Sequence, residues 1–143
     1  MKRTLLSLIA ILAITMGSFA QSMYWNKQNS GMAESRGLQD LMAVDANIVW
    51  GAAYDGVTPT NPCVNITRTS DGGTTWIPKT INGAASVCIA NICGIDANKA
   101  WAITYYPTGT GANDGVYYTA DGGTTWTHQT TAAFSNSASS GVM

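Results

Sequence analysis

The side chains of this chain that could take part in chemistry are mainly its eight carboxylates. Glycoside hydrolysis uses two such groups, one on each side of the scissile bond. The acidic residues outside the repeated turns described below are Glu34, Asp40, Asp55 and Asp114. Asp55 and Asp114 each precede a glycine, a context typical of turns. A turn-forming role therefore competes with a catalytic role at both positions.

The other residue types form no recognisable catalytic motif or metal-binding group. His128 is the only histidine, and neither a second histidine nor a paired cysteine motif accompanies it, so the sequence predicts no metal site. There is no serine or cysteine nucleophile motif, phosphate-binding loop or dinucleotide fingerprint. Asn65-Ile66-Thr67 fits a glycosylation sequon, which we interpret as a chance match. We expect no cofactor and no complete catalytic constellation in this chain, which leaves open whether the protein is an enzyme.

An internal repeat is the dominant feature of the chain. Residues 69–76 return after 50 residues as residues 119–126 with one substitution, and residues 44–50 return after 51 residues as 95–101. The tryptophans follow this period as two series, Trp25, Trp76 and Trp126, and Trp50 and Trp101. The sequence therefore predicts an array of one structural unit. We expect Trp76 and Trp126 to occupy equivalent buried positions, and Trp50 and Trp101 likewise.

The repeated octapeptide has the composition of a hairpin turn. Asp71 and Asp121 can accept hydrogen bonds from nearby backbone N–H groups, and the glycines that follow can adopt positive φ. An aspartate needed in every unit cannot single out one active site, so we interpret it as structural. The residues given this structural role are Thr69, Asp71, Gly73, Thr75, Trp76, Thr119, Asp121, Gly123, Thr125 and Trp126. Asp45 and Asp96 are interpreted as turn formers in the same way.

Short β-rich runs alternate with polar turn clusters, and no segment shows a sustained helical period, so the sequence favours an all-β fold. We expect four antiparallel strands in each unit. They cover residues 38–44, 48–54, 64–69 and 75–80 in the first unit, and 87–95, 100–105, 115–119 and 125–130 in the second.

Both octapeptides match the Asp-box consensus, Ser/Thr-x-Asp-x-Gly-x-Thr-Trp, at every defined position. The chain thus resembles the Asp-box (BNR-like) repeat β-propellers, which include sialidases, sortilin-type receptor domains, photosystem assembly factors and xyloglucanase-like hydrolases. The resemblance implies an incomplete propeller with two four-stranded blades, over residues 38–85 and 86–131. Residues 21–37 would add an extra outer strand, at 23–29, and a linker. Residues 132–143 would begin a truncated third blade of a longer protein.

The N-terminus has the pattern of a secretory signal peptide over residues 1–20. Lys2 and Arg3 precede an apolar run, and Ser18-Phe19-Ala20 fits a cleavage site. The run is too short to favour a membrane span, so we expect a secreted, periplasmic or cell-surface protein with no transmembrane span after cleavage. Cleavage leaves five basic against eight acidic residues, which argues against a nucleic-acid partner.

The resemblance implies a function in binding. We expect a scaffold module that presents loops to a carbohydrate or an extracellular protein. One alternative is the N-terminal part of a secreted glycoside hydrolase, sialidase- or xyloglucanase-like, whose catalytic residues lie in missing blades. A sialidase site needs three arginines, and only Arg36 and Arg68 remain after signal cleavage. The other alternative is an assembly factor.

In a propeller the long loops, here residues 55–63 and 106–114, share one face. Candidate ligand contacts at that face are Tyr54, Asp55, Tyr105, Tyr106 and Asp114. Packing between blades is the alternative role for the three tyrosines.

Export permits a disulfide, and three cysteines allow one at most. Cys88 and Cys93 lie five residues apart in one expected strand, so they point to opposite faces and cannot pair. Cys63 and Cys88 fall on the same face of the expected propeller. We therefore expect a Cys63–Cys88 disulfide and a buried thiol at Cys93.

Overall fold

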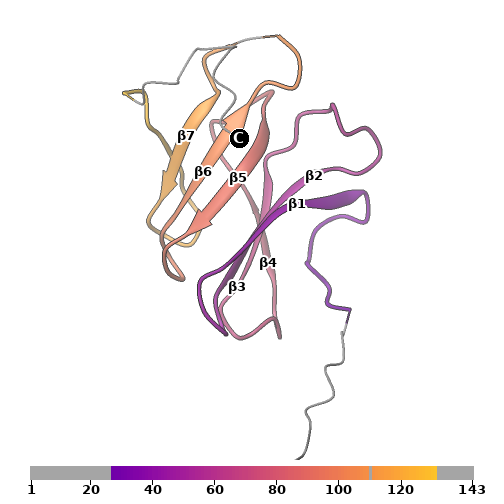
Figure 1. The fold of residues 1–143 in the computed structure, drawn as a ribbon, viewed down its shortest axis with the longest axis vertical. Coiled ribbons are helices and arrows are strands. Elements are labelled where there is room, and N and C mark those ends of the chain that lie inside the picture. The colour runs from indigo at the N-terminus through magenta and orange to yellow at the C-terminus, as the bar shows by residue number, and fades with distance from the viewer. Residues whose placement is uncertain (1–26, 110, 132–143) are drawn as a thin grey trace, which may run out of the picture.

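The computed structural model describes residues 27–109 and 111–131, which form two antiparallel sheets of four strands each (Figure 1). The first sheet consists of β1 (Arg36–Ala43), β2 (Val49–Asp55), β3 (Asn65–Thr69) and β4 (Ile77–Thr80). The second consists of β5 (Cys88–Gly94), β6 (Ala100–Tyr105), β7 (Gly115–Thr119) and β8 (Thr127–His128). Strands lie side by side in chain order within each sheet. The described residues contain no helix, and so none that could cross a membrane, and the predicted all-β fold is confirmed.

Several strand ends differ from the prediction. β1 begins at Arg36 and β8 ends at His128, each two residues earlier than expected, and most other ends lie within one residue of the predicted bounds. β4 and β8 begin at Ile77 and Thr127, two residues later than expected, because the preceding Thr-Thr-Trp segment belongs to the turn. The described part of the expected N-terminal strand, residues 27–29, is not a strand. This segment contacts the first sheet through side chains, as when Gln28 Oε1 accepts a hydrogen bond from Trp76 Nε1 at 2.9 Å. The expected signal peptide, at residues 1–20, and the expected start of a third blade, at residues 132–143, lie outside the described residues.

Both sheets share one local geometry. A β-bulge interrupts the first ladder between Leu38 and Asp40, and another interrupts the second between Ile89 and Asn91. These bulges are equivalent in the repeat. A bulge re-aims the side chains that follow it, so both first strands turn the same residues toward the same sides. The two sheets are therefore built on one plan.

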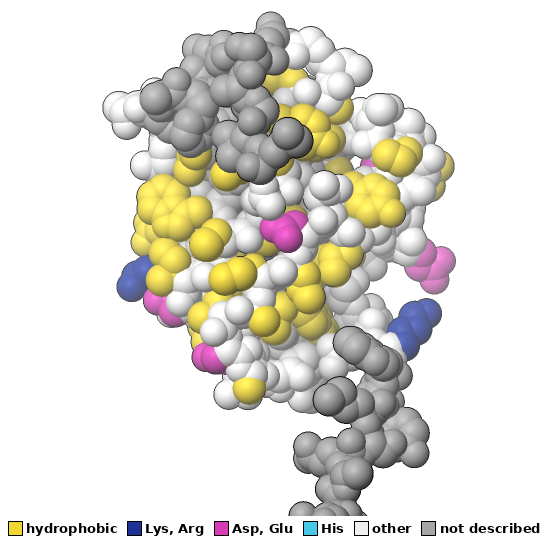
Figure 2. Space-filling model, in the orientation of Figure 1, with side chains coloured by type: hydrophobic (Ala, Val, Ile, Leu, Met, Phe, Trp, Pro, Cys, Tyr) yellow, Lys and Arg dark blue, Asp and Glu magenta, His cyan; other side chains and the backbone are white. Residues whose placement is uncertain are grey.

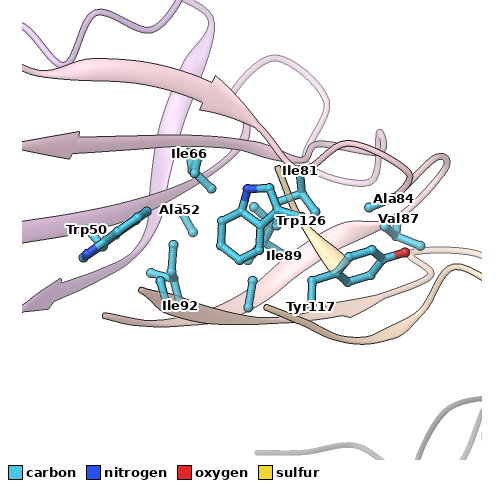
Figure 3. Close-up of a cluster of buried hydrophobic side chains, with 12 residues drawn as sticks. Trp50, Ala52, Ile66, Ile81, Ala84, Val87, Ile89, Ile92, Tyr117 and Trp126 are labelled. Carbon is cyan, nitrogen blue, oxygen red and sulfur yellow. The ribbon is translucent and has the colours of Figure 1, made fainter. Parts of the chain in front are cut away.

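The core lies between the two sheets, where β5 contacts both β1 and β2. Figure 3 shows its aromatic members, Trp50, Trp126 and Tyr117, together with aliphatic side chains from both sheets and from the segment between them. Burial of apolar surface contributes about 25 cal/mol per Å² to stability. Apolar burial is therefore the main interaction that stabilises the contact between the two repeats.

Burial of all four paired tryptophans was predicted, and this is wrong for two of them. Trp50 and Trp126 are buried, whereas Trp76 is half-buried and Trp101 is 37% exposed. The members of each pair do occupy equivalent places, with Trp50 in β2 and Trp101 in β6. Burial differs because Trp50 and Trp126 face the contact between the sheets, while the other two face sides on which no neighbouring sheet is described.

The expected Cys63–Cys88 disulfide is not formed, and both residues are thiols. Their backbones are neighbours through an isolated bridge. Their sulfur atoms, however, donate to separate acceptors. Cys63 Sγ is 3.5 Å from Asn65 Oδ1, and Cys88 Sγ is 3.4 Å from the carbonyl oxygen of Asn61.

The prediction of a buried thiol at Cys93 is also wrong, because Cys93 is exposed. It pairs with Trp101 across the β5–β6 ladder. Directly paired residues lie on the same face of a sheet, so Cys93 shares the uncovered face with Trp101.

Candidate functional site

The first of the two repeated octapeptide turns, residues 69–76, is held by its own side chains. Asp71 Oδ1 accepts the backbone N–H of Thr75 at 2.9 Å and the hydroxyl of Thr69 at 2.8 Å. Thr69 Oγ1 in turn accepts the N–H of Gly73 at 2.9 Å. Hydrogen bonds from the Thr75 side chain and backbone lower the pKa of Asp71. The carboxylate is therefore engaged within the turn.

The second turn repeats this network. Asp121 Oδ1 accepts the N–H of Thr125 at 2.8 Å and of Thr124 at 3.0 Å, and the Thr119 hydroxyl lies 3.0 Å away. The backbone and side chain of Thr125 lower the pKa of Asp121 to about 2. The second glycine of the turn, Gly123, has a φ of 82°, which a residue with a side chain rarely adopts. Sequence and geometry thus agree on what these residues do locally.

The two kinds of repeated turn lie together at one end of each sheet. The N–H of Gly72 donates to the carbonyl of Asn47 at 3.1 Å, and that of Gly122 to the carbonyl of Asn98 at 2.8 Å. Asp96 caps the second of these partner turns by accepting two backbone N–H groups. This end of both sheets is occupied by structural hydrogen bonds.

The opposite end carries the longer loops. Asp55 lies at the end of β2, where it accepts the N–H groups of Thr58 and Val57 at 3.1 and 3.0 Å and pairs with Arg36 at 3.0 Å. Hydrogen bonds from Thr58 and Val57, followed by Arg36, lower the pKa of Asp55 to about 2. A carboxylate with so low a pKa stays ionised and cannot act as a general acid near neutral pH. Sequence reasoning missed Arg36 as the partner of Asp55.

The three tyrosines have different surroundings. Tyr54 is half-buried against Gly37, and the Tyr106 hydroxyl accepts the N–H of Asn113 at 3.1 Å, which closes the β6–β7 loop. Tyr105 is exposed, although partial burial, followed by the nearby Cys88 thiol, raises its pKa. Of the three rings, Tyr105 has the surface most available to a ligand.

Asp114 belongs to the same end of the second sheet. Its carbonyl oxygen lies 2.9 Å from His128 Nε2, which ties the β6–β7 loop to β8. One oxygen of its carboxylate is enclosed and has no hydrogen-bond partner among the described residues. The imidazole of His128 stacks on Tyr117 with 4.6 Å between ring centroids. His128 is thus part of the packing of the second sheet.

Loops from both sheets meet at this end. Tyr105 pairs with Cys88, and the Cys88 thiol donates to the carbonyl of Asn61 in the β2–β3 loop. Asn113 Nδ2 donates to the carbonyl of Ala85 at 3.1 Å, which joins the β6–β7 loop to the connection between the sheets. Residues 27–109 and 111–131 bring no three His, Cys, Asp or Glu side chains together in a way that could hold a metal ion.

A second surface, which sequence reasoning missed, lies on the first sheet. An apolar groove of about 300 Å³ runs between β1 and the first repeated octapeptide turn. Its lining includes Gln28, Leu38, Leu41, Val49, Gly73 and Trp76. The repeat could have revealed this surface, because Leu38 and Leu41 align with Ile89 and Ile92 of the second unit.

No protein-family model matches this chain, and no curated protein is significantly similar to it.

Proposed function

We propose that this chain is a secreted Asp-box β-propeller fragment that serves as a binding and scaffold module. Its ligand, a carbohydrate or an extracellular protein segment, binds at the loop-bearing end of the sheets. The main support for the proposal is that the two ends of the sheets differ in structure. Repeated turns that share most of their hydrogen bonds occupy one end, while loops of unrelated sequence gather at the other. Loops held by a rigid scaffold are the usual place for recognition.

Three of the carboxylates have structural roles that do not suit hydrolysis. Asp71 and Asp121 are engaged in their turns, and Asp55 is held as an anion by Arg36 and by loop N–H groups. A glycosidase needs one protonated carboxyl group as an acid, which these three groups do not provide near neutral pH.

Tyr105 is the contact we would test first, because its exposed ring lies where the loops meet. A glycan array and a panel of extracellular proteins, probed with the full chain, should identify a ligand. Tyr105→Ala should then weaken its binding by about tenfold or more, as expected for an aromatic anchor. Ile77→Ala is the matched control, since Ile77 is equally exposed but begins β4, next to the Asp-box turn.

Two results would contradict the proposal. One is turnover of a glycoside by the purified chain, which would mean that this chain itself contains a catalytic site. The other is a ligand whose affinity falls with Ile77→Ala and not with Tyr105→Ala. Secretion is tested separately, by sequencing the N-terminus of protein recovered outside the cell, which we expect to begin at Gln21.

A further inference from the structure

The two sheets contact each other through different faces. The face of the first sheet, which we call the plug face, consists of Trp50, Ala52 and Ile66. The face of the second sheet, which we call the socket face, consists of Ile89, Ile92, Ala100, Gly123 and Trp126. Figure 3 shows side chains of the two faces packed together. This contact shows how one unit of the repeat recognises the next.

Trp50 is the centre of the contact. Its indole passes so close to Gly94 that any Cβ there would collide with it. Trp50 Nε1 donates to the carbonyl of Asp96 at 2.9 Å, and the guanidinium of Arg68 lies 5.5 Å from the ring centroid. A buried tryptophan with a satisfied N–H is the kind of residue that dominates the energy of an interface.

The first sheet carries a second copy of the socket face, on its other side. Leu38 and Leu41 take the places of Ile89 and Ile92 in the repeat. The leucines are 49% and 52% exposed, whereas the isoleucines are 1% and 3% exposed. The leucines line the apolar groove described above, together with Val49, Gly73 and Trp76. The same surface is thus covered in one unit and open in the other.

The second sheet carries a second copy of the plug face. Trp101 takes the place of Trp50, and Tyr118 takes the place of Arg68 beside it, with 4.6 Å between the ring centroids of Trp101 and Tyr118. Trp101 is 37% exposed, and hydrophobic side chains reach the surface over both sheets (Figure 2). Within residues 27–109 and 111–131, one socket face and one plug face are therefore open.

We propose that the open socket of the first sheet binds the open plug of a second copy of this chain, with Trp101 in the role that Trp50 has inside one copy. Each of the two surfaces has an equivalent that is already packed against a partner of this kind. Because plug and socket differ, the contact is head-to-tail, and two joined copies leave one socket and one plug free. Further copies then extend the assembly into a closed ring or an open chain.

One substitution and one overlying side chain make the open socket face shallower than the one that Trp50 fills. Ala43 stands where the second unit has Gly94, so an incoming indole must sit farther from β1 than Trp50 sits from β5. The side chain of Gln28 lies over Gly73 and has to swing aside. Association between copies is accordingly weaker than the internal contact, and Ala43→Gly should strengthen it.

The test is the mass of the full chain by sedimentation velocity, over about 1 to 200 µM, a range that covers micromolar dissociation constants. We expect a mass that rises with concentration above that of the monomer, which is 15.0 kDa for all 143 residues and less for protein that begins at Gln21. Trp101→Ala removes the plug and Leu41→Glu blocks the socket, and each should weaken association by about tenfold or more. Both residues are exposed, so neither substitution should unfold the monomer. Val57→Glu, at an exposed position outside both surfaces, is the matched control and should change nothing.

Mixing the two defective variants decides the geometry. The Trp101→Ala variant keeps an intact socket face, and the Leu41→Glu variant keeps an intact plug face. The mixture should therefore form a 1:1 dimer, which grows no further because its two remaining faces are defective. A wild-type chain that stays monomeric at 200 µM would overturn the proposal and favour a further unit of a longer polypeptide as the occupant. Association that the mixture fails to restore would also overturn it, because it indicates a symmetric or non-specific contact.

Discussion

Replacing Trp50 with alanine should remove the largest side chain that is completely buried between the sheets. A buried aromatic side chain removes about 150–250 Å² from water, which at about 25 cal/mol per Å² is worth about 4–6 kcal/mol as an upper bound. Loss of the Nε1 hydrogen bond to the carbonyl of Asp96 leaves that carbonyl unpaired. Substitutions of this type cost about 3–5 kcal/mol, and we expect a loss of about 4 kcal/mol in the free energy of unfolding.

The chain contains its own control, because Trp101 occupies the same position in the repeat. Trp101 is partly exposed, so Trp101→Ala leaves no closed cavity and mainly loses the contact with Tyr118. We expect a cost of about 1 kcal/mol. The difference between the two substitutions therefore measures what the sheet contact contributes.

Urea unfolding followed by far-UV circular dichroism is the assay, at a protein concentration low enough to exclude association between copies. Domains of this size are stable by about 5–15 kcal/mol, so Trp50→Ala can leave part of the protein unfolded. Trp50→Phe provides a milder second variant, which keeps most of the ring and loses about 1–2 kcal/mol with the hydrogen bond. Equal costs for Trp50→Ala and Trp101→Ala would refute the assignment of Trp50 to the core.

Three further predictions concern the turns and the cysteines. Gly123 and Gly83 both have positive φ, but a Cβ at Gly123 would lie 2.9 Å from Ile66 Cδ1 and one at Gly83 has nothing within 4 Å. In urea unfolding, Gly83→Ala should lower the free energy of unfolding by about 1 kcal/mol, and Gly123→Ala should lower it by at least about 1 kcal/mol more. A larger loss for Gly83→Ala would contradict the packing described at Gly123. Since backbone donors of its own turn lower the pKa of Asp121 to about 2, ionised Asp121 stabilises the fold above its unfolded pKa of 3.8. That stability is lost as the pH falls toward 2. In Asp121→Asn, the melting temperature should therefore decline less steeply below about pH 5 than in the wild type. An unchanged decline would count against this role of Asp121. A thiol reagent should modify Cys93 in the folded protein and reach the two buried cysteines only after unfolding, as read by mass spectrometry; a disulfide in the unreduced protein would contradict this.

The sequence by itself determined the strands and turns of this protein, because their causes are local. Asp121 reaches the N–H of a residue only four positions away, and Gly123 adopts its positive φ within the same turn. β6 and β7 begin and end at the predicted residues for the same reason. The 50-residue period then predicted that the second sheet copies the first.

Only the tertiary structure decided what each copy faces. Trp50 and Trp101 occupy the same place in the repeat, yet one is buried and the other partly exposed. Trp50 faces the second sheet, whereas Trp101 faces a side on which no neighbouring sheet is described. The cysteines show the same limit, since neighbouring backbones at Cys63 and Cys88 do not bring the two sulfur atoms to each other. Local chemistry sets a residue's conformation, whereas its burial and its partners depend on which surface the fold places against it.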